Sequence, residues 1–269
     1  MTAAKALTPA ERRHFLAKGY VILKGCFTKK AAAPWIKNAC ALLGYDPRKP
    51  AAWKEEKCSL PGSETVHISE FAPRVLDATF ELVGGEDRLR EGRTMQTWVD
   101  SFVIKFPCGD PAAGEVDMKR HGWHVDGDEM HYLDSPLGLL HYVVWSDLKP
   151  RGGGTLIVPD SIGFVARLLA RHPEGIRREA LSLEVLARFD DFKEVVELTG
   201  SAGDVVLVHP YMIHAESRNI QGPPRFFTVR GTELLEPLNF NRKDPKEFSP
   251  VESAVLNALG AKRLDFKRK

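Results

Sequence analysis

Residues 139–159, LLHYVVWSDLKPRGGGTLIVP, carry the pattern that decides the fold. Two short apolar runs rich in β-branched and aromatic residues are separated by a turn of proline and glycine. Runs of this length indicate strands, because helices need longer stretches with a period near 3.6. Gly152-Gly153-Gly154 lacks the Gly-Lys-Ser/Thr ending of a phosphate-binding loop. We therefore interpret the glycine run as a turn that enters the second strand.

Similar short runs continue on both sides of this stretch. They are MQTWVDSFVIKF (95–106), FKEVVELTG (192–200), DVVLVHP (204–210) and RFFTVRGTELL (225–235). Many short strands with turn residues between them predict a sandwich or barrel. One helical insertion is expected to interrupt them, from Ser161 towards Ala187.

Helices are expected at both ends of the chain. Thr8-Pro9-Ala10-Glu11 and Ser249-Pro250-Val251-Glu252 both have the capping-box pattern that begins a helix. After the first box the pattern predicts, in order, a helix end at Gly19, a strand over 20–27, a helix through Trp35 to Leu43 and a loop over 46–56. The expected architecture is mainly β with flanking helices. We expect a single domain over 1–269, with a helical part at about 8–60, a β core at about 95–238 and a last helix at about 250–259.

Composition excludes several classes of partner. The 38 basic and 36 acidic residues give a net charge of +2, which provides no electrostatic footprint for nucleic acid or for a membrane surface. No run of about 18 apolar residues is present, and the first residues lack the apolar stretch of a signal peptide. The four cysteines form no Cys-x-x-Cys pair. We expect a soluble cytoplasmic protein with a small-molecule substrate, and the sequence does not indicate an oligomeric state.

His124-Val125-Asp126 is a candidate for part of a metal site. Residues two apart in a strand face the same side, so the imidazole and the carboxylate can reach one metal ion. The pair alone is not specific, and a third ligand must come from a distant strand. His214 follows the DVVLVHP run, and His209 at the end of that run is its rival. Two histidines and one carboxylate leave coordination positions open, which suits Fe(II) oxygenases.

Arg225 lies on the next expected strand and strengthens this interpretation. A guanidinium that points into the same barrel can grip a carboxylate with two parallel hydrogen bonds. The alternative is a solvated turn residue beside Pro223-Pro224. His121 and His131 bracket the His-x-Asp pair, and we interpret them as solvated or core-edge residues rather than substrate contacts. The acidic run 126–129 has too few oxygen ligands, and the wrong spacing, for a calcium loop.

The chain resembles the phytanoyl-CoA dioxygenase-like family of Fe(II)/2-oxoglutarate oxygenases. The segments that carry the resemblance are LTPAERRHFLAKGYVILKGCF (7–27), WHVDGD (123–128), WSDLKPRGGGTLIVPDS (145–161) and GDVVLVHPYMIHAESRN (203–219), followed by Arg225. Their order and spacing extend over nearly the whole chain. The resemblance implies a double-stranded β-helix core of the jelly-roll or cupin type. It also implies iron ligands at His124, Asp126 and His214, and Arg225 on the far carboxylate of 2-oxoglutarate.

The resemblance implies further contacts to 2-oxoglutarate. Trp145 corresponds to a tryptophan that flanks the cosubstrate, Ser101 or Phe102 falls near another contact, and His67 falls at a basic one. The family commonly has a serine two positions after the third iron ligand. Glu216 stands there in this chain, and the following Ser217 is the candidate to replace that serine.

The implied reaction converts 2-oxoglutarate and O₂ to succinate and CO₂ while a substrate C–H bond is oxidised. Because Asp126 is retained, the open position that iron-dependent halogenases use for chloride is absent. Hydroxylation is therefore favoured, with desaturation and ring rearrangement as relatives. Two other classes remain open: a cupin-like metal protein without redox activity, and an inactive relative that acts through protein contacts. Residues 46–66 and 107–123 are candidates for a lid. Kinship of fold does not select the substrate.

Overall fold

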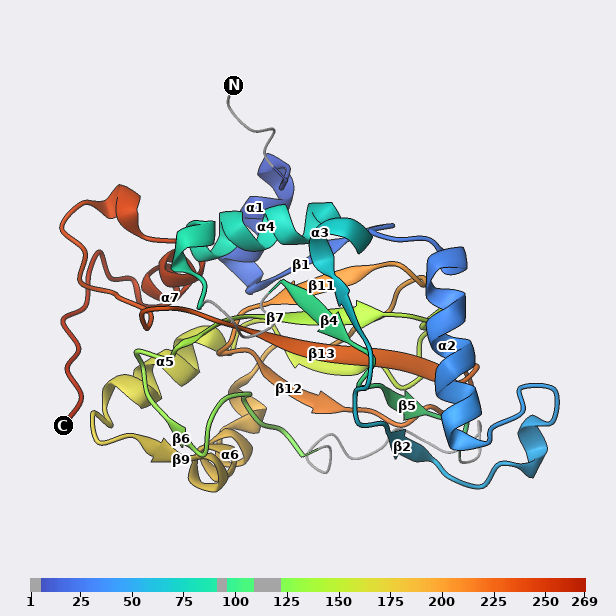
Figure 1. The fold of residues 1–269 in the computed structure, drawn as a ribbon. Helices are drawn as coiled ribbons and strands as arrows, with labels where there is room; N and C mark the ends of the chain where they lie inside the picture. Colours follow the sequence, from blue (N-terminus) through green and yellow to red (C-terminus); the bar gives the residue numbers. More distant parts are fainter. Residues whose placement is uncertain (1–5, 91–95, 109–121) are drawn as a thin grey trace.

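The computed structural model describes residues 6–90, 96–108 and 122–269, and its core is made of two sheets (Figure 1). The larger sheet has the strand order β1 (Tyr20–Leu23), β11 (Val205–Val208), β7 (Leu137–Val144), β13 (Arg225–Glu233), β5 (Val103–Lys105) and β2 (Lys57–Ser59). The smaller sheet has the order β10 (Val196–Glu197), β8 (Thr155–Val158) and β12 (Ile213–Glu216). Two further pairs are β3 (Thr65–His67) with β4 (Thr97–Val99), and β6 (Met130–His131) with β9 (Ile176–Arg177). Every strand pairing among these residues is antiparallel.

The space between the two sheets is filled by an inner cluster of apolar side chains. Tyr142 and Val144 of β7 belong to this cluster, together with Phe227 of β13 and Ile157 of β8. Val143, between them in sequence, belongs instead to an outer cluster on the opposite face of the larger sheet. Successive strand residues point to opposite faces, so this alternation gives the sheet one side for the barrel interior and one for the helices. The double-stranded β-helix expected from the sequence is confirmed.

Seven helices surround the two sheets in the described part of the chain. They are α1 (Pro9–Lys18), α2 (Lys29–Leu43), α3 (Ile68–Phe71), α4 (Pro73–Val83), α5 (Ile162–Ala170), α6 (Arg178–Ala187) and α7 (Pro250–Leu259), with the 3-10 turns η1 (Pro50–Ala52), η2 (Glu86–Arg88), η4 (Phe189–Asp191) and η5 (Pro245–Glu247). Figure 1 shows α1, α3 and α4 along one side of the larger sheet and α2 at its end, while α5 and α6 lie beside β6 and β9. Within the described residues, no helix is both long and apolar enough to cross a membrane.

Both expected capping boxes are present. Thr8 Oγ1 accepts from Glu11 N at 3.2 Å, and Glu11 Oε2 accepts from Thr8 N at 2.8 Å. Ser249 and Glu252 make the same reciprocal pair at the start of α7. The predicted start of each of these helices is therefore confirmed, because a capping box satisfies backbone donors locally and does not depend on distant packing.

Three expectations about the elements were wrong or incomplete. The helical insertion over 161–187 is two helices, since Pro173 and the positive φ of Gly175 end the first one and β9 follows before the second. The strand expected over 20–27 ends at Leu23, because the chain turns at Gly25, whose φ is +60°. The sequence pattern also left residues 68–83 unassigned, although they form α3 and α4.

Of the two segments expected to form a lid, only 46–66 lies fully within the described residues. Part of the 46–66 segment is β2, which pairs with β5 at the edge of the larger sheet. That part is fixed by backbone hydrogen bonds and does not serve as a free loop. Most of the 107–123 segment lies outside the described residues.

Candidate active site

His124, Asp126 and His214 come together at one end of the inner face. His124 and His214 form a bridge in which each backbone N–H donates to the other's carbonyl at 3.0 Å. His214 lies within β12, whereas His124 makes only this isolated bridge. The expectation that His124 and Asp126 lie in a continuous strand was therefore wrong. His124 Nε2 lies 3.7 Å from Asp126 Oδ1, and His214 Nε2 lies 3.5 Å from Asp126 Oδ2. Candidate ligand atoms of the three side chains all lie within 4.8 Å of one another.

The backbone orients both imidazoles for metal binding. His124 Nδ1 donates to the Gly122 carbonyl at 2.9 Å, and His214 Nδ1 donates to the Met212 carbonyl at 3.0 Å. A hydrogen bond from one ring nitrogen fixes the tautomer and leaves the other nitrogen's lone pair available as a ligand. Both Nε2 atoms face the carboxylate of Asp126. These two hydrogen bonds therefore aim the lone pairs at one point.

The charge states of these groups also suit a cation. Burial, followed by the neighbouring His214, lowers the pKa of His124 below its usual value. Burial by itself opposes ionisation of Asp126, but in the metal-free protein protonated His214, through a hydrogen bond and its charge, and protonated His124 hold the pKa of Asp126 below its usual value. A bound cation would take the place of these protons. A neutral imidazole and an ionised carboxylate are the forms that bind metals. Two imidazole nitrogens and one carboxylate oxygen, with their outer atoms held by the backbone, fit a divalent iron ion.

A row of inward-facing residues leads from this group to Arg225. The Tyr142 ring lies 5.8 Å from the His214 ring and 5.6 Å from the Phe227 ring, and the Arg225 guanidinium lies 4.1 Å from the Phe227 centroid. Burial first, and then the charge of Asp126, raises the pKa of Tyr142, whereas Arg225 acts in the opposite direction. Among the described residues, Tyr142 Oη and Arg225 Nε are buried without a hydrogen-bond partner. The structure therefore brings Arg225 to the same interior as the metal-binding group.

Trp145 lies on the other face of the larger sheet. Its indole Nε1 donates to Thr228 Oγ1 at 2.9 Å, and its ring packs against Phe27 and Trp35 of the outer layer. Since residues 143 and 145 alternate with 142 and 144, the aromatic side chain that faces the metal-binding group is Tyr142. Tyr142 was not identified from the sequence. The period of two along the apolar run 139–145 was the signal that could have identified it.

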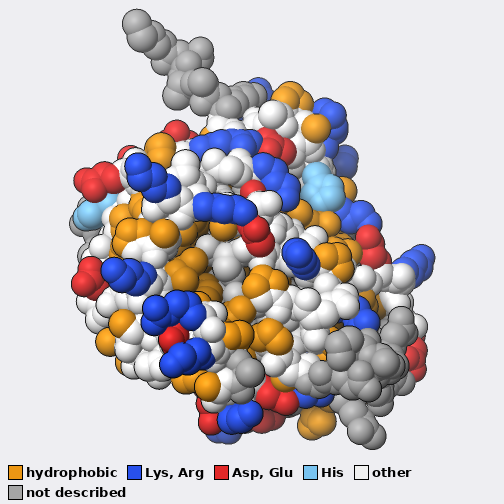
Figure 2. Space-filling view, turned by 90° about the vertical axis from the view of Figure 1, so that its right-hand side faces the viewer, with side chains coloured by type: hydrophobic (Ala, Val, Ile, Leu, Met, Phe, Trp, Pro, Cys, Tyr) orange, Lys and Arg blue, Asp and Glu red, His pale blue; other side chains and the backbone are white. Residues whose placement is uncertain are grey.

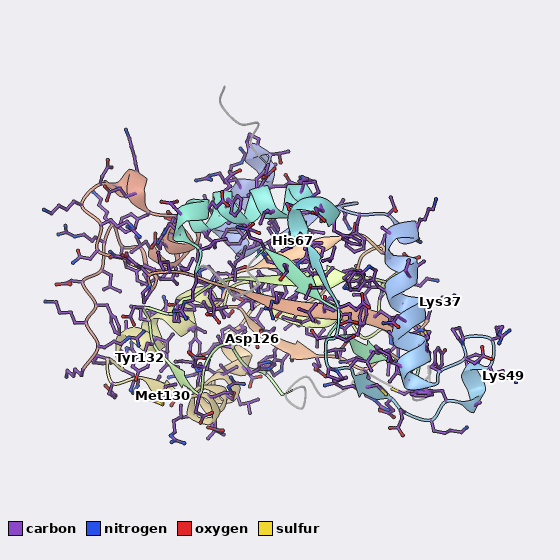
Figure 3. All side chains as sticks on the ribbon, in the orientation of Figure 1. Lys37, Lys49, His67, Asp126, Met130 and Tyr132 are labelled. Carbon is purple, nitrogen blue, oxygen red and sulfur yellow. The ribbon has the colours of Figure 1, made fainter. Side chains whose placement is uncertain are left out.

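The remaining predicted contacts are not brought to this group. His67 is exposed at the end of β3, and Figure 3 shows it beside α3, on the opposite side of the larger sheet from Asp126. Ser101 lies in the link between β4 and β5, and the adjacent Phe102 packs outward against Trp145. Ser217 Oγ donates to the Gly154 carbonyl at 2.6 Å, which commits its hydroxyl to the neighbouring chain.

Two other histidines considered from the sequence, His209 and His131, make hydrogen bonds with the backbone. His209 is fully buried on the helical side, where its Nε2 donates to the Val251 carbonyl at 3.2 Å and its Nδ1 accepts from Tyr211 N at 3.0 Å. His131 is buried and donates to the Val125 carbonyl at 3.2 Å. His121 lies outside the described residues. The rival third ligand, His209, is therefore held away from His124 and Asp126.

Two adjoining hollows open beside Asp126. One has a volume of about 500 Å³ and is lined by residues of β7 and β13, including Leu140 and Val229, with Arg90 and Glu233 at its margin. Arg90 Nη1 and Glu233 Oε2 lie 3.3 Å apart. The second hollow has a volume of about 320 Å³ and reaches His131 and Tyr211. A metal ion held by Asp126 would therefore lie next to space for a small molecule.

A larger hollow of about 810 Å³ lies elsewhere, between α2 and the end of β7. Figure 2 faces this side of the molecule and shows hydrophobic side chains among lysines and arginines. Its lining includes Ile36, Cys40 and the outward-facing Trp145, and none of the three metal-binding residues. The largest volume therefore does not identify the active site. The candidate active site is at the smaller hollows, beside the converging side chains of His124, Asp126 and His214.

Comparisons with known proteins agree with this geometry. The family model described as phytanoyl-CoA dioxygenase (PhyH) matches residues 15–226. The crystal structure of HygX from Streptomyces hygroscopicus with nickel and 2-oxoglutarate bound has 15% identity and a TM-score of 0.50, covering 84% of this chain and 87% of that chain. EctD from S. alaskensis in its apoform has 18% identity and a TM-score of 0.50, covering 87% and 79% respectively. At these identities the two structures support the fold alone.

No curated protein sequence gives a significant match to this chain. The family model nevertheless spans well over half of the chain, and its matched region contains His124, Asp126, His214 and Arg225. The chain therefore belongs to the phytanoyl-CoA dioxygenase family of Fe(II)- and 2-oxoglutarate-dependent oxygenases.

Proposed function

We propose that this protein hydroxylates an unactivated C–H bond of a small molecule, with Fe(II), 2-oxoglutarate and O₂, and releases succinate and CO₂. The observation that carries the proposal is the convergence of two imidazole Nε2 atoms on one carboxylate, with a buried arginine on the same inner face. Iron with its cosubstrate would supply the oxidising power, since O₂ reduction is coupled to decarboxylation of the 2-oxo acid. The protein's own residues bind, orient and enclose these groups.

His124, Asp126 and His214 would hold the iron and leave neighbouring positions for the keto acid and O₂. The carbonyls of Gly122 and Met212 keep the two rings in the ligating tautomer. Arg225 would bind the distal carboxylate in a setting that is 3% exposed, where a charged hydrogen bond is weakly screened. These residues position the cosubstrate and do not themselves react.

The substrate would occupy the hollow of about 500 Å³ beside Asp126. Its lining combines apolar side chains of β7 and β13 with the Arg90–Glu233 ion pair. This mixture suits a small molecule with an apolar body and polar substituents. Retention of the Asp126 carboxylate favours hydroxylation over halogenation, as expected from the sequence.

An anaerobic binding experiment tests the metal and cosubstrate parts of this function. Addition of Fe(II) and 2-oxoglutarate to the protein is expected to give a weak visible metal-to-ligand absorption band. Asp126→Ala is expected to abolish the band, because it removes the only anionic side chain of the three ligands. Asp128→Ala, which removes an exposed carboxylate two positions away, is the matched control and keeps the band. A wild-type protein without the band, or an Asp126→Ala variant that retains it, contradicts the proposal.

Turnover of a metabolite library tests the reaction itself. Succinate released above the uncoupled background identifies a substrate, and a product heavier by one oxygen atom indicates hydroxylation. A product lighter by two hydrogens indicates desaturation, and one of altered connectivity indicates rearrangement, so either result contradicts the hydroxylase assignment while preserving the oxygenase class. A metal protein without redox activity gives no substrate-dependent succinate.

We further propose that residues 1–269 form one domain and that the protein is cytoplasmic. The outer apolar cluster includes residues from Leu7 near the start of the chain to Leu256 in α7, which supports one shared core. The cysteines Cys26, Cys40, Cys58 and Cys108 are free thiols, which is the usual state in a reducing compartment.

A further inference from the structure

Three basic residues lie side by side across neighbouring strands of the larger sheet. Lys105 of β5 pairs directly with Arg225 of β13 on one side and with Lys57 of β2 on the other. Residues opposite each other in an antiparallel pair point to the same face, so all three are directed towards the inner side of the sheet. Lys105 is 5% exposed and Arg225 is 3% exposed. Two buried cations therefore lie next to each other.

Like charges opposite each other destabilise a sheet, and buried charges need a partner. Burial first, and then the charge of Arg225, lowers the pKa of Lys105 to about 8. Within the described part of the chain, Lys105 is paired with Glu216, whose side chain is 47% exposed and whose Oε2 lies 3.3 Å from Lys105 Nζ. Glu216 Oε1 also lies 2.8 Å from Lys57 Nζ. Among the described residues, this half-exposed carboxylate contacts Lys105 and Lys57, while Arg225 lies beside them, so the three cations outnumber the carboxylate that faces them.

Glu216 connects this group of cations to the iron site. It lies two residues after His214 in β12, so both side chains are on the same face of that strand. Lys105 Nζ donates to the Ser217 carbonyl at 2.5 Å, which fixes the ammonium group against the end of β12. Ser217 itself points its hydroxyl to Gly154. The position where the family commonly has a serine hydroxyl therefore has a carboxylate here, with a lysine facing it.

We propose that Lys105 acts with Arg225 as a second cation for the distal carboxylate of 2-oxoglutarate, and that Glu216 is the resting counter-ion which this carboxylate displaces. The inference rests on the proposed function and concerns how the same site recognises its cosubstrate. Lys105 is a positioning residue: it supplies positive charge and an N–H donor in place of a serine hydroxyl. Glu216 leaves towards solvent and Lys57, to which it is already paired.

A purely structural role for Lys105 makes a different prediction. In that case the ammonium group would only tether the Ser217 carbonyl and Glu216 to the sheet. Its loss would lower the stability of the fold, and it would affect all 2-oxo acids equally. Two acids separate the roles: 2-oxoglutarate, and 2-oxopentanoate, which has the same chain length without the distal carboxylate.

The test is an anaerobic titration of the Fe(II)-loaded protein with each acid. The intensity of the visible metal-to-ligand band reports how much acid is bound. Lys105→Gln keeps a hydrogen-bond donor and removes the charge. It is expected to weaken binding of 2-oxoglutarate by about tenfold or more, the scale of one charged hydrogen bond, and to leave 2-oxopentanoate unchanged. Lys105→Arg is expected to restore most of the 2-oxoglutarate affinity. Thermal melts of both variants check that each is folded.

Two further variants complete the experiment. Glu216→Gln is expected to tighten 2-oxoglutarate binding, because it removes the competing carboxylate. Lys29→Met, which removes a lysine paired with Asp147 on the α2 side, is the control and changes neither affinity. Equal weakening of both acids by Lys105→Gln, no weakening at all, or weaker 2-oxoglutarate binding in Glu216→Gln overturns the proposal. A wild-type protein that binds neither acid contradicts the proposed function itself.

Discussion

His209 and His214 show how the two faces of the barrel assign different roles to the same residue type. His209 continues the outward alternation of Val205 and Leu207, and its ring is held between Tyr211 N and the Val251 carbonyl. The chain then crosses to the smaller sheet, where His214 faces the interior. Burial lowers the pKa of His209 to about 3, so its ring is neutral and serves as a fixed hydrogen-bonding element.

Asparagine variants of these two histidines are expected to have opposite effects. His209→Asn breaks two buried hydrogen bonds and is expected to lower the free energy of unfolding by about 2 kcal/mol, with the Fe(II)/2-oxoglutarate band retained. His214→Asn is expected to abolish the band with a smaller change in stability. Chemical denaturation and the anaerobic titration measure the two quantities. Loss of the band in His209→Asn alone would reverse the assignment of the third ligand.

Tyr142 is expected to show a trade-off between stability and binding. Its hydroxyl is buried without a partner among the described residues, between Asp126 and Arg225. Removal of an unpaired buried hydroxyl by Tyr142→Phe is expected to raise the free energy of unfolding of the metal-free protein by about 1 kcal/mol. If the hydroxyl donates to the cosubstrate, the same variant binds 2-oxoglutarate about fivefold more weakly. Urea denaturation and the anaerobic titration test both parts, and unchanged affinity would exclude a cosubstrate contact.

At the scale of elements, the sequence predicted what local interactions determine. Thr8 and Ser249 begin their helices as expected, because each capping box is complete within four residues. The three ligands and Arg225 were also named from the sequence, through the resemblance rather than through spacing alone. The side of the sheet that Trp145 faces was not predicted, since a strand's register depends on which face is buried by distant residues. The adjacency of Lys105 and Arg225 was not predicted either, because the two residues are neighbours only across the sheet.

The start of α7 is held by a buried ion cluster that its capping-box pattern did not predict. Glu252 completes the capping box, but it is also fully buried between Arg88 and Arg242, with Oε1 at 2.7 Å and 3.0 Å from their Nη2 atoms. Burial opposes its ionisation, but the hydrogen bonds from Arg88, Arg242 and the backbone lower its pKa to about 2. A carboxylate of the capping box thus joins α7 to η2 and to the loop before the helix.

This ion cluster predicts acid sensitivity with a definite sign. Because the folded pKa of Glu252 lies below its ordinary value of 4.5, its stabilisation is fully present above about pH 4.5 and is lost as the pH falls towards 2. Glu252→Gln is expected to lower the free energy of unfolding at pH 7 by about 3 kcal/mol, and the difference from wild type is expected to shrink below pH 4.5. Urea denaturation across this pH range measures it. Glu247→Gln, at an exposed position, is the control. A difference independent of pH would contradict the role of the charge.

In the whole molecule, the two faces of the larger sheet have different roles: the outer face packs against the main apolar core, and the inner face borders the metal-binding group. Its outer face and the helices form the outer cluster that extends from Leu7 to Leu256, whereas its inner face carries Tyr142, Lys105 and Arg225. The ligands come from segments far apart in sequence, His124 and Asp126 on one side and β12 on the other. His124 is bridged to His214 of the smaller sheet, whereas Arg225 lies in the larger sheet. The metal-binding group and Arg225 therefore come together only when the two sheets face each other.

A metal ion that binds these ligands is expected to stabilise the entire fold. Ni(II), which undergoes no oxidation in air under these conditions, is a suitable probe. At one hundred times its dissociation constant, binding to the folded state alone contributes about 2.7 kcal/mol, which corresponds to a rise of about 5–10 °C in Tm for a domain of this size. Tryptophan fluorescence and far-UV circular dichroism are expected to report one coincident transition before and after addition of the metal. Asp126→Ala is expected to keep the single transition and to lose most of the shift. Two transitions, with only one moved by Ni(II), would contradict the single-domain proposal, and an unmoved wild-type transition would contradict the metal site.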